Sequence, residues 1–299
     1  MTSSAPTFAR RRQRTARRMT SSARFYSQAT SIWLATPLML ALLAGFLYPV
    51  ARLIALSFSG GTLNHYRRIF TEPLHLSVLV STVEVAAVVT MACLALGFPV
   101  AYLMAKLSKG LAMVTAACVF IPLWTSILIR SYAWVVLLQR HGLINGLLVK
   151  SGIVDDPLKL IYTQGAVVVA MTHVLLPFMI LPIYSGLRGM SPDYLRAARN
   201  LGAGPTRAFL EVTVPLSLPG VFAGSVMCFV LALGFYITPA LVGGPSSMLM
   251  ATLIGQQTTV LLDWPFAAAL STLLLAVTVL SVLLFRRTLS FSKGLNSVH

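Results

Sequence analysis

Residues 191–215 read SPDYLRAARNLGAGPTRAFLEVTVP, and this polar stretch between long apolar runs decides the interpretation of the whole chain. Ser191 and Asp193 mark a strong helix start, with a capping hydroxyl, a proline between them, and an acid at the positive end of the helix dipole. Gly202 is typical of the left-handed residue that ends a helix. A second start follows at Gly204. The stretch therefore predicts two short helices joined by a glycine.

The remainder of the sequence has the composition of a membrane protein. Of its 299 residues, 57% are hydrophobic and 10% are charged, and the mean hydropathy is +0.82. Soluble domains carry about 25% charged residues. A soluble protein with a very large core is the weaker alternative, because the chain has too little polar sequence to cover such a globule.

Six stretches are long and apolar enough to cross a bilayer. A spanning helix needs about 20 apolar residues, because it must satisfy its own backbone polar groups in lipid. The six stretches are 32–51, 85–105 (with a start near residue 76), 111–138, 160–187, 216–240 and 264–285. Pro239 and the Gly243-Gly244-Pro245 turn are expected to end the fifth. The sequence thus predicts an all-α polytopic membrane protein with six transmembrane helices.

Basic residues predict the orientation and the division of the chain. Sixteen Lys and Arg residues fall in segments on the side of the N-terminus and five on the other side, which places both termini in the cytoplasm. We expect a disordered cytoplasmic tail at 1–30, a six-helix domain at 31–287 and a cytoplasmic tail at 288–299. Seven arginines in the first tail indicate contact with anionic membrane lipid rather than nucleic acid, and a transit peptide stays open.

The sequence contains no pattern typical of catalysis. The Gly-x-x-x-x-Gly-Lys, HExxH and Gly-x-Ser-x-Gly motifs are all missing, so no ATP site or hydrolase is indicated. The three cysteines are odd in number and lack a CxxC spacing, which indicates neither a disulfide framework nor a metal site. We therefore expect no catalytic residue, no metal and no cofactor bound by this chain.

Physical reasoning leaves two roles open for the polar stretch. Its first helix could rest on lipid with arginines against headgroups, or it could dock onto another protein. Ala197, Ala198 and Gly202 favour docking, because small side chains let a helix lie deep in a groove.

The stretch resembles the EAA loop of ABC importer permeases, whose pattern is Glu-Ala-Ala, three residues, Gly, nine residues and Ile-x-Leu-Pro. Ala197, Ala198, Gly202 and Pro215 keep every spacing, whereas Arg196 stands in place of Glu. The resemblance implies the type I ABC importer permease fold, with the loop at about 188–215 forming a cytoplasmic coupling helix that docks into an ATPase. It implies ATPase-coupling roles for these five residues. The ion pair that the usual Glu makes in this family cannot be assigned to Arg196, because the charge is reversed. The alternative is that Arg196 meets an acidic residue of the partner.

Four further stretches resemble spermidine/putrescine permease B-type subunits: 121–130, 173–182, 238–244 and 263–266. This implies a permease in the bacterial inner membrane that imports a polyamine. It implies two copies of a cytoplasmic ABC ATPase that hold ATP and Mg, a second permease subunit and an extracytoplasmic solute-binding protein. Opine, amino-acid-like and ferric-iron permeases look similar, so those substrates stay open. A transporter driven by an ion gradient and a membrane scaffold are the rivals from other classes.

Two charges lie inside predicted spans. Glu84 and Arg130 each lie about eight residues from the outer end of their helix, which places both roughly 12 Å deep. Intramembrane charges usually face the bundle interior. We expect the two residues to form an ion pair or to flank the solute path, with independent snorkelling as the alternative.

Aromatic residues could supply a cation-binding surface for a polyamine. Trp124, Tyr132, Trp134 and Tyr236 are the candidates, and membrane-interface or packing roles are the alternative. His173 is expected to be a hydrogen-bonded packing residue.

Overall fold

The computed structural model describes residues 28–59 and 63–295, and these form helices and turns without a strand. Contacts divide the chain into two compact units, Met1–Ala55 and Leu56–His299. Apart from residues 28–30, the predicted tail at 1–30 lies outside the described residues, as do 296–299 of the predicted C-terminal tail. The described part of the first unit belongs to α2 (Gln28–Ser57). The most apolar stretch of this helix contains no buried residue.

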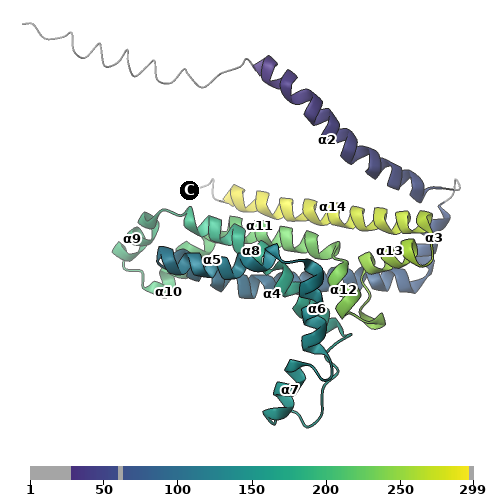
Figure 1. Ribbon diagram of the computed structural model, residues 1–299. Coiled ribbons are helices and arrows are strands. Elements are labelled where there is room, and N and C mark those ends of the chain that lie inside the picture. Colours follow the sequence, from purple (N-terminus) through teal and green to yellow (C-terminus); the bar gives the residue numbers. More distant parts are fainter. Residues whose placement is uncertain (1–27, 60–62, 296–299) are drawn as a thin grey trace, which may run out of the picture. The chain divides into compact units, whose positions relative to one another are not determined.

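The second unit follows in chain order (Figure 1). Its elements are α3 (Asn64–Thr71), α4 (Pro73–Lys106), α5 (Lys109–Trp124), α6 (Ile127–Leu138), α7 (Leu143–Lys150), α8 (Gln164–Arg188), α9 (Pro192–Asn200), α10 (Pro205–Ala208), the π-helix η1 (Phe209–Thr213), α11 (Val214–Leu233), α12 (Ile237–Val242), the short 3-10 helix η2 (Pro245–Ser247), α13 (Met250–Thr259) and α14 (Trp264–Leu295).

Five described helices are long and apolar enough to span a membrane, and a sixth span exists if one bent pair counts as one. The five are α2, α4, α8, α14 and the continuous helical segment Pro205–Leu233, which consists of α10, η1 and α11 and is called the rod below. The predicted all-α architecture is confirmed. Helix α14 continues to Leu295, so the described part of the predicted C-terminal tail is helical.

The prediction of one continuous third helix is wrong. The pair Lys109–Trp124 and Ile127–Lys150 is bent by 99°. The break falls at Thr125 and Ser126, whose backbones are extended. Both the N–H and the hydroxyl of Thr125 donate to the Pro122 carbonyl, at 3.2 and 2.7 Å. Thr and Ser side chains compete with helical hydrogen bonds in this way, and hydropathy cannot register that competition.

The fifth predicted helix also ends too late. Helix α11 stops at Leu233, before Gly234, and α12 follows after a short break. Pro239 does not end a helix, because it lies in the first turn of α12, where its missing N–H has no partner to lose. Gly243 and Gly244 end α12, a short helix that sequence reasoning did not separate from the fifth span.

The core of the second unit lies among α4, α8 and α11, which lie alongside one another in Figure 1. Buried apolar side chains from all three helices fill it, among them Val85, Met171 and Met179. Cys93 and Cys228 are buried there and donate their thiols to carbonyls of α8, each at 3.6 Å. These two cysteines pack as small apolar residues, whereas Cys118 is exposed.

Glycines allow α8 and α11 to approach closely. A Cβ atom at Gly220 would lie 2.6 Å from the Pro182 carbonyl oxygen, and one at Gly224 would lie 3.1 Å from the Met179 carbonyl oxygen. These glycines are four residues apart, which is the small-residue spacing of close helix pairs in membranes. The backbones therefore meet without room for a methyl group.

We predict that Gly220→Ala separates α8 from α11 and destabilises the unit by about 1–3 kcal/mol, as overpacked cores do. The measurement is the temperature at which the detergent-solubilised protein loses its monodisperse elution. Gly146→Ala is the control, because a Cβ at this exposed position of α7 meets no atom within 4 Å. Equal thermal stability of the two variants would contradict the close contact.

Candidate functional site

Helix α9 begins at the predicted cap. The Ser191 hydroxyl accepts a hydrogen bond from the Asp193 N–H at 3.3 Å. Arg196 Nη1 pairs with Asp193 Oδ1 at 3.1 Å, and both side chains are more than 70% exposed. An exposed pair of this kind contributes less than about 1 kcal/mol. Arg196 thus has an acidic neighbour within its own helix.

Helix α9 ends at the predicted glycine. Gly202 has φ +83°, in the left-handed region that favours glycine. Its N–H donates to the Arg199 carbonyl at 2.9 Å, and the Ala203 N–H donates to the Ala198 carbonyl at 3.0 Å. These two bonds make a Schellman motif, which satisfies carbonyls that the helix end leaves open. The chain reverses sharply here and turns towards α10.

The surface of α9 is open along its whole length. None of its residues is buried, and Ala197 is exposed while Ala198 is half-buried. Tyr194 is 56% exposed and Leu201, directly after the helix, is 89% exposed. A nine-residue helix is too short to be stable in water by itself. The apolar side chains and the alanines together offer a surface that suits contact with another molecule.

The connection from this loop into α11 is helical throughout. Residues Pro205–Leu233 form one rod, in which η1 separates α10 from α11. In η1 the Val214 N–H donates to the Phe209 carbonyl, five residues back. Pro215 is exposed in the first turn of α11 and has no N–H for the Glu211 carbonyl, so the regular ladder is interrupted and the wider π-turn is favoured. A rod thus joins α9 to the core.

An aromatic cluster fastens this rod to α4. The ring of Phe209 lies edge-on to Phe98 and to Tyr102, with centroids 6.2 and 5.0 Å away. Lys106 Nζ lies 4.2 Å from the centre of the Tyr102 ring. Edge-to-face pairs contribute about 0.5–1.5 kcal/mol each beyond their buried area. Phe209 therefore joins the loop region to the end of α4, some hundred residues earlier in the chain.

The structure does not bring the five predicted solute-path residues together. In the described part of the chain no hydrogen bond, ion pair or ring contact joins any two of Glu84, Arg130, Trp124, Tyr132 and Tyr236. The expected Glu84–Arg130 ion pair is therefore not formed. Glu84 is exposed on α4. Arg130 is partly buried on α6, and its Nε and Nη1 atoms are buried without a hydrogen-bond partner among the described residues.

Three of the four aromatic candidates are exposed. Trp124 is 91%, Tyr132 56% and Tyr236 45% exposed. The Tyr236 ring leans against α13, because a Cβ at Gly255 would lie 2.5 Å from one of its ring carbons.

His173 is a hydrogen-bonded packing residue, as expected. Its Nδ1 accepts a hydrogen bond from Trp134 Nε1 at 3.2 Å, and the two rings lie edge to face at 5.8 Å. The contact links Trp134 on α6 to α8, so this indole is not a free aromatic surface.

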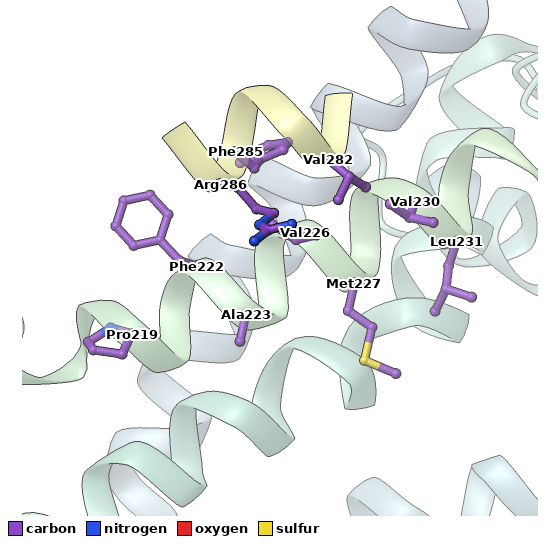
Figure 2. Close-up of a pocket in the computed structure, with 10 residues that line it drawn as sticks. All are labelled: Pro219, Phe222, Ala223, Val226, Met227, Val230, Leu231, Val282, Phe285 and Arg286. Atoms are coloured by element: carbon purple, nitrogen blue, oxygen red, sulfur yellow. The ribbon is translucent and has the colours of Figure 1, made fainter. Parts of the chain in front are cut away.

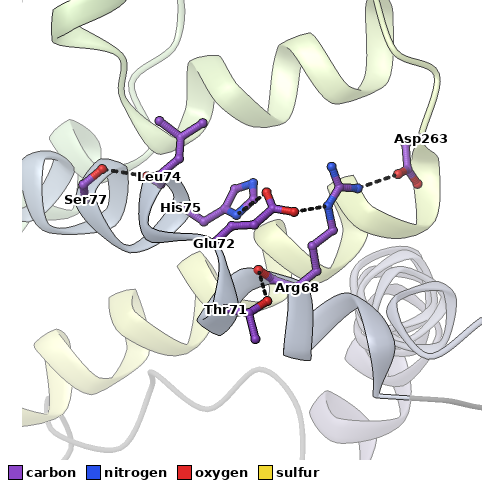
Figure 3. Close-up of polar contacts among 7 residues, drawn as sticks. All are labelled: Arg68, Thr71, Glu72, Leu74, His75, Ser77 and Asp263. Carbon is purple, nitrogen blue, oxygen red and sulfur yellow. Dashed lines mark hydrogen bonds and ion pairs between the residues drawn. The ribbon is translucent and has the colours of Figure 1, made fainter.

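Sequence reasoning missed a polar cluster at the other end of the unit (Figure 3). Arg68 Nε pairs with Glu72 Oε1 at 3.1 Å, and its Nη1 pairs with Asp263 Oδ2 at 3.4 Å. The Asp263 carboxylate also accepts the Phe266 N–H at 3.2 Å and so caps α14. The Arg68–Glu72 spacing could have been recognised as a helical pair. The contact with Asp263, 195 residues later, has no local signal.

Known proteins with similar sequences are membrane components of transport systems. Residues 27–290 match the family described as "Binding-protein-dependent transport system inner membrane component". The chain is 35% identical, over 76% of its length and 82% of the relative, to the spermidine/putrescine transport system permease protein PotB of Escherichia coli (strain K12). It is 33% identical, over 72% of its length and 80% of the relative, to the molybdenum transport system permease protein ModB of Mycobacterium bovis.

A solved structure shares the fold. A chain of the bacterial alginate ABC transporter, in complex with an alginate pentasaccharide-bound periplasmic protein, superposes with a TM-score of 0.72. It covers 88% of this chain and 96% of that one at 17% identity. The arrangement of helices is thus that of an ABC transporter subunit.

We predict that Phe209→Ala loosens the rod between α9 and α11. Losing two edge-to-face contacts costs about 1–3 kcal/mol, which raises the rate of amide hydrogen exchange in residues 205–213 by a factor of about 5 to 150. Hydrogen-exchange mass spectrometry measures this. Leu210→Ala is the matched control, because Leu210 follows Phe209 in η1 but is 58% exposed. Equal exchange in the two variants would show that the aromatic cluster does not hold the rod.

Proposed function

Since this chain belongs to the family of binding-protein-dependent transport system inner membrane components, we propose that it translocates a polyamine such as spermidine or putrescine into the cytoplasm. The chain is a permease subunit of an ABC importer, a multi-pass protein of the inner membrane and not an enzyme. The observation that carries the substrate proposal is the 35% identity to a spermidine/putrescine permease over three quarters of the chain.

The exposed side chains of the proposed solute path support this substrate. Glu84 provides a negative charge on α4, and Trp124, Tyr132 and Tyr236 provide open aromatic faces. Carboxylates and aromatic faces attract polycations. Arg130 would repel a polycation, so in this proposal its buried N–H groups meet a carboxylate of another subunit of the assembly. Opine, amino-acid-like and ferric-iron substrates are the alternatives.

The proposed assembly contains two copies of a cytoplasmic ATPase, a second permease and an extracytoplasmic solute-binding protein. ATP and Mg belong to the ATPase. The proposed contact with the ATPase is α9, with Arg196, Ala197 and Ala198 on the helix and Gly202 fixing its end. Both termini and α9 then lie in the cytoplasm, in agreement with the excess of basic residues on that side.

The proposed coupling follows the covalent and packed connections of the loop. When ATP closes the ATPases, α9 moves with them. The rod Pro205–Leu233 carries that motion into α11, and the contact of Phe209 with Phe98 and Tyr102 carries it into α4. No bond is made or broken in this chain. Its contribution is to open the solute cavity, shared with the second permease, to alternate sides.

We predict that Gly202→Val uncouples transport. A β-branched side chain at φ +83° costs about 1–2 kcal/mol, so the end of α9 rearranges and ATP-driven uptake of labelled spermidine falls about tenfold. The same change lowers the amount of ATPase that co-purifies with the permease.

Gly204→Val is the matched control for this substitution. Gly204 lies two residues further on and has φ −64°, which any residue adopts. A Cβ meets no atom within 4 Å at either glycine. If both variants transport normally, the conformation of Gly202 has no role in coupling.

We predict that proteoliposomes containing the whole assembly take up spermidine only when ATP is present on the side of the membrane that bears the ATPases. Excess putrescine is expected to compete with spermidine, whereas molybdate and ferric iron are not. Competition by molybdate or iron would reject the polyamine but keep the importer. Uptake driven by an ion gradient without ATP would reject the coupling role of α9.

A further inference from the structure

Helices α11 and α14 enclose an apolar groove with one cation beside it (Figure 2). The groove has a volume of about 450 Å³. Apart from Arg286, every residue that lines it is apolar, with Phe222, Val226 and Val230 on α11 and Val282 on α14 as examples.

The groove has the dimensions of part of a lipid chain. Its lining residues on α11 recur every three or four positions from Pro219 to Leu231. They therefore form one face along roughly 18 Å of helix. The hydrocarbon layer of one leaflet is about 15 Å thick. Arg286 faces Val226, about midway along this face, and the part from Val226 to Leu231 is roughly 8 Å long. The groove therefore holds the headgroup-proximal half of one acyl chain between α11 and α14.

Arg286 lies where an anionic headgroup would bind. It ends the apolar span Trp264–Arg286, which is the level at which charged side chains reach the membrane surface. Figure 2 shows its guanidinium directed from α14 across the groove towards Val226. Among the described residues no carboxylate pairs with Arg286.

The charge of the groove selects the kind of lipid. A basic side chain at the membrane surface attracts anionic headgroups, and no acidic residue lines the groove to oppose them. We propose that the groove binds one anionic phospholipid, with its phosphate on Arg286 and an acyl chain along α11. This site is independent of the solute path and of the polyamine proposal.

The test uses the whole assembly in nanodiscs of equal phosphatidylglycerol and phosphatidylcholine, and native mass spectrometry counts the lipids that stay bound after extraction. Wild type is expected to keep phosphatidylglycerol in preference. In Arg286→Gln this preference falls about fivefold, which is the contribution of one basic residue near an anionic surface. Arg188→Gln is the matched control, an exposed arginine at the end of α8 outside the groove.

A second variant tests the groove without changing the charge. Ala223 is exposed within the groove, so Ala223→Phe fills the space and both phospholipids are lost. Inorganic phosphate in excess leaves the lipid in place, because the acyl chain contributes to binding.

Three results would overturn the proposal. The first is an unchanged lipid preference in Arg286→Gln. The second is displacement of the lipid by inorganic phosphate, which would assign the site to a free anion. The third is loss of the second permease from the Ala223→Phe assembly with no change in bound lipid, which would show that a protein helix occupies the groove.

Discussion

The close packing of α4, α8 and α11 around Met179 is the constraint on which the rest of the second unit depends. A Cβ at Gly224 would lie 2.8 Å from the Met179 sulfur, and a Cβ at Gly97 would lie 3.1 Å from its Cγ. One methionine is thus held between glycines of two other helices. In lipid, helices associate through such packing because hydrophobic burial gives little drive. Close-packed interiors deform little, so the three helices are expected to move as one body.

Movement within the second unit must then concentrate where helices are interrupted. Three such interruptions in the described part of this unit are the break at Thr125 and Ser126, the π-helix η1, and the break between α11 and α12. Of these, only η1 lies in the rod from α9, and the aromatic contact of Phe209 lies within it. A displacement of α9 is therefore transmitted through η1, whose Phe209 contacts α4. Because α4 and α11 both belong to the packed core, the displacement reaches the core through both helices.

The sequence predicts features that depend on composition or on neighbouring residues. The long apolar runs predict the spans, because lipid demands a helix, and Ser191 and Gly202 predict both ends of α9. Other features depend on residues far apart or on small backbone changes. The capping of α14 by Asp263 is local, but its pairing with Arg68 is not. The bend at Thr125 lies between two equally apolar helices, and η1 differs from an α-helix by one hydrogen-bond step. The contact of Phe209 with Tyr102 appears only once the helices pack.

The substitution of Arg196 for the usual Glu changes what the proposed docking surface depends on. Arg196 already pairs with Asp193 at the surface. A carboxylate on the ATPase would replace one exposed ion pair with another, and the net free energy of that exchange is small. Shape is then the larger contribution: Ala197 lets α9 approach closely, Leu201 presents an exposed apolar side chain, and Gly202 fixes the direction in which the chain leaves. The spacing of small residues, and not the charge, is what this chain shares with the EAA pattern.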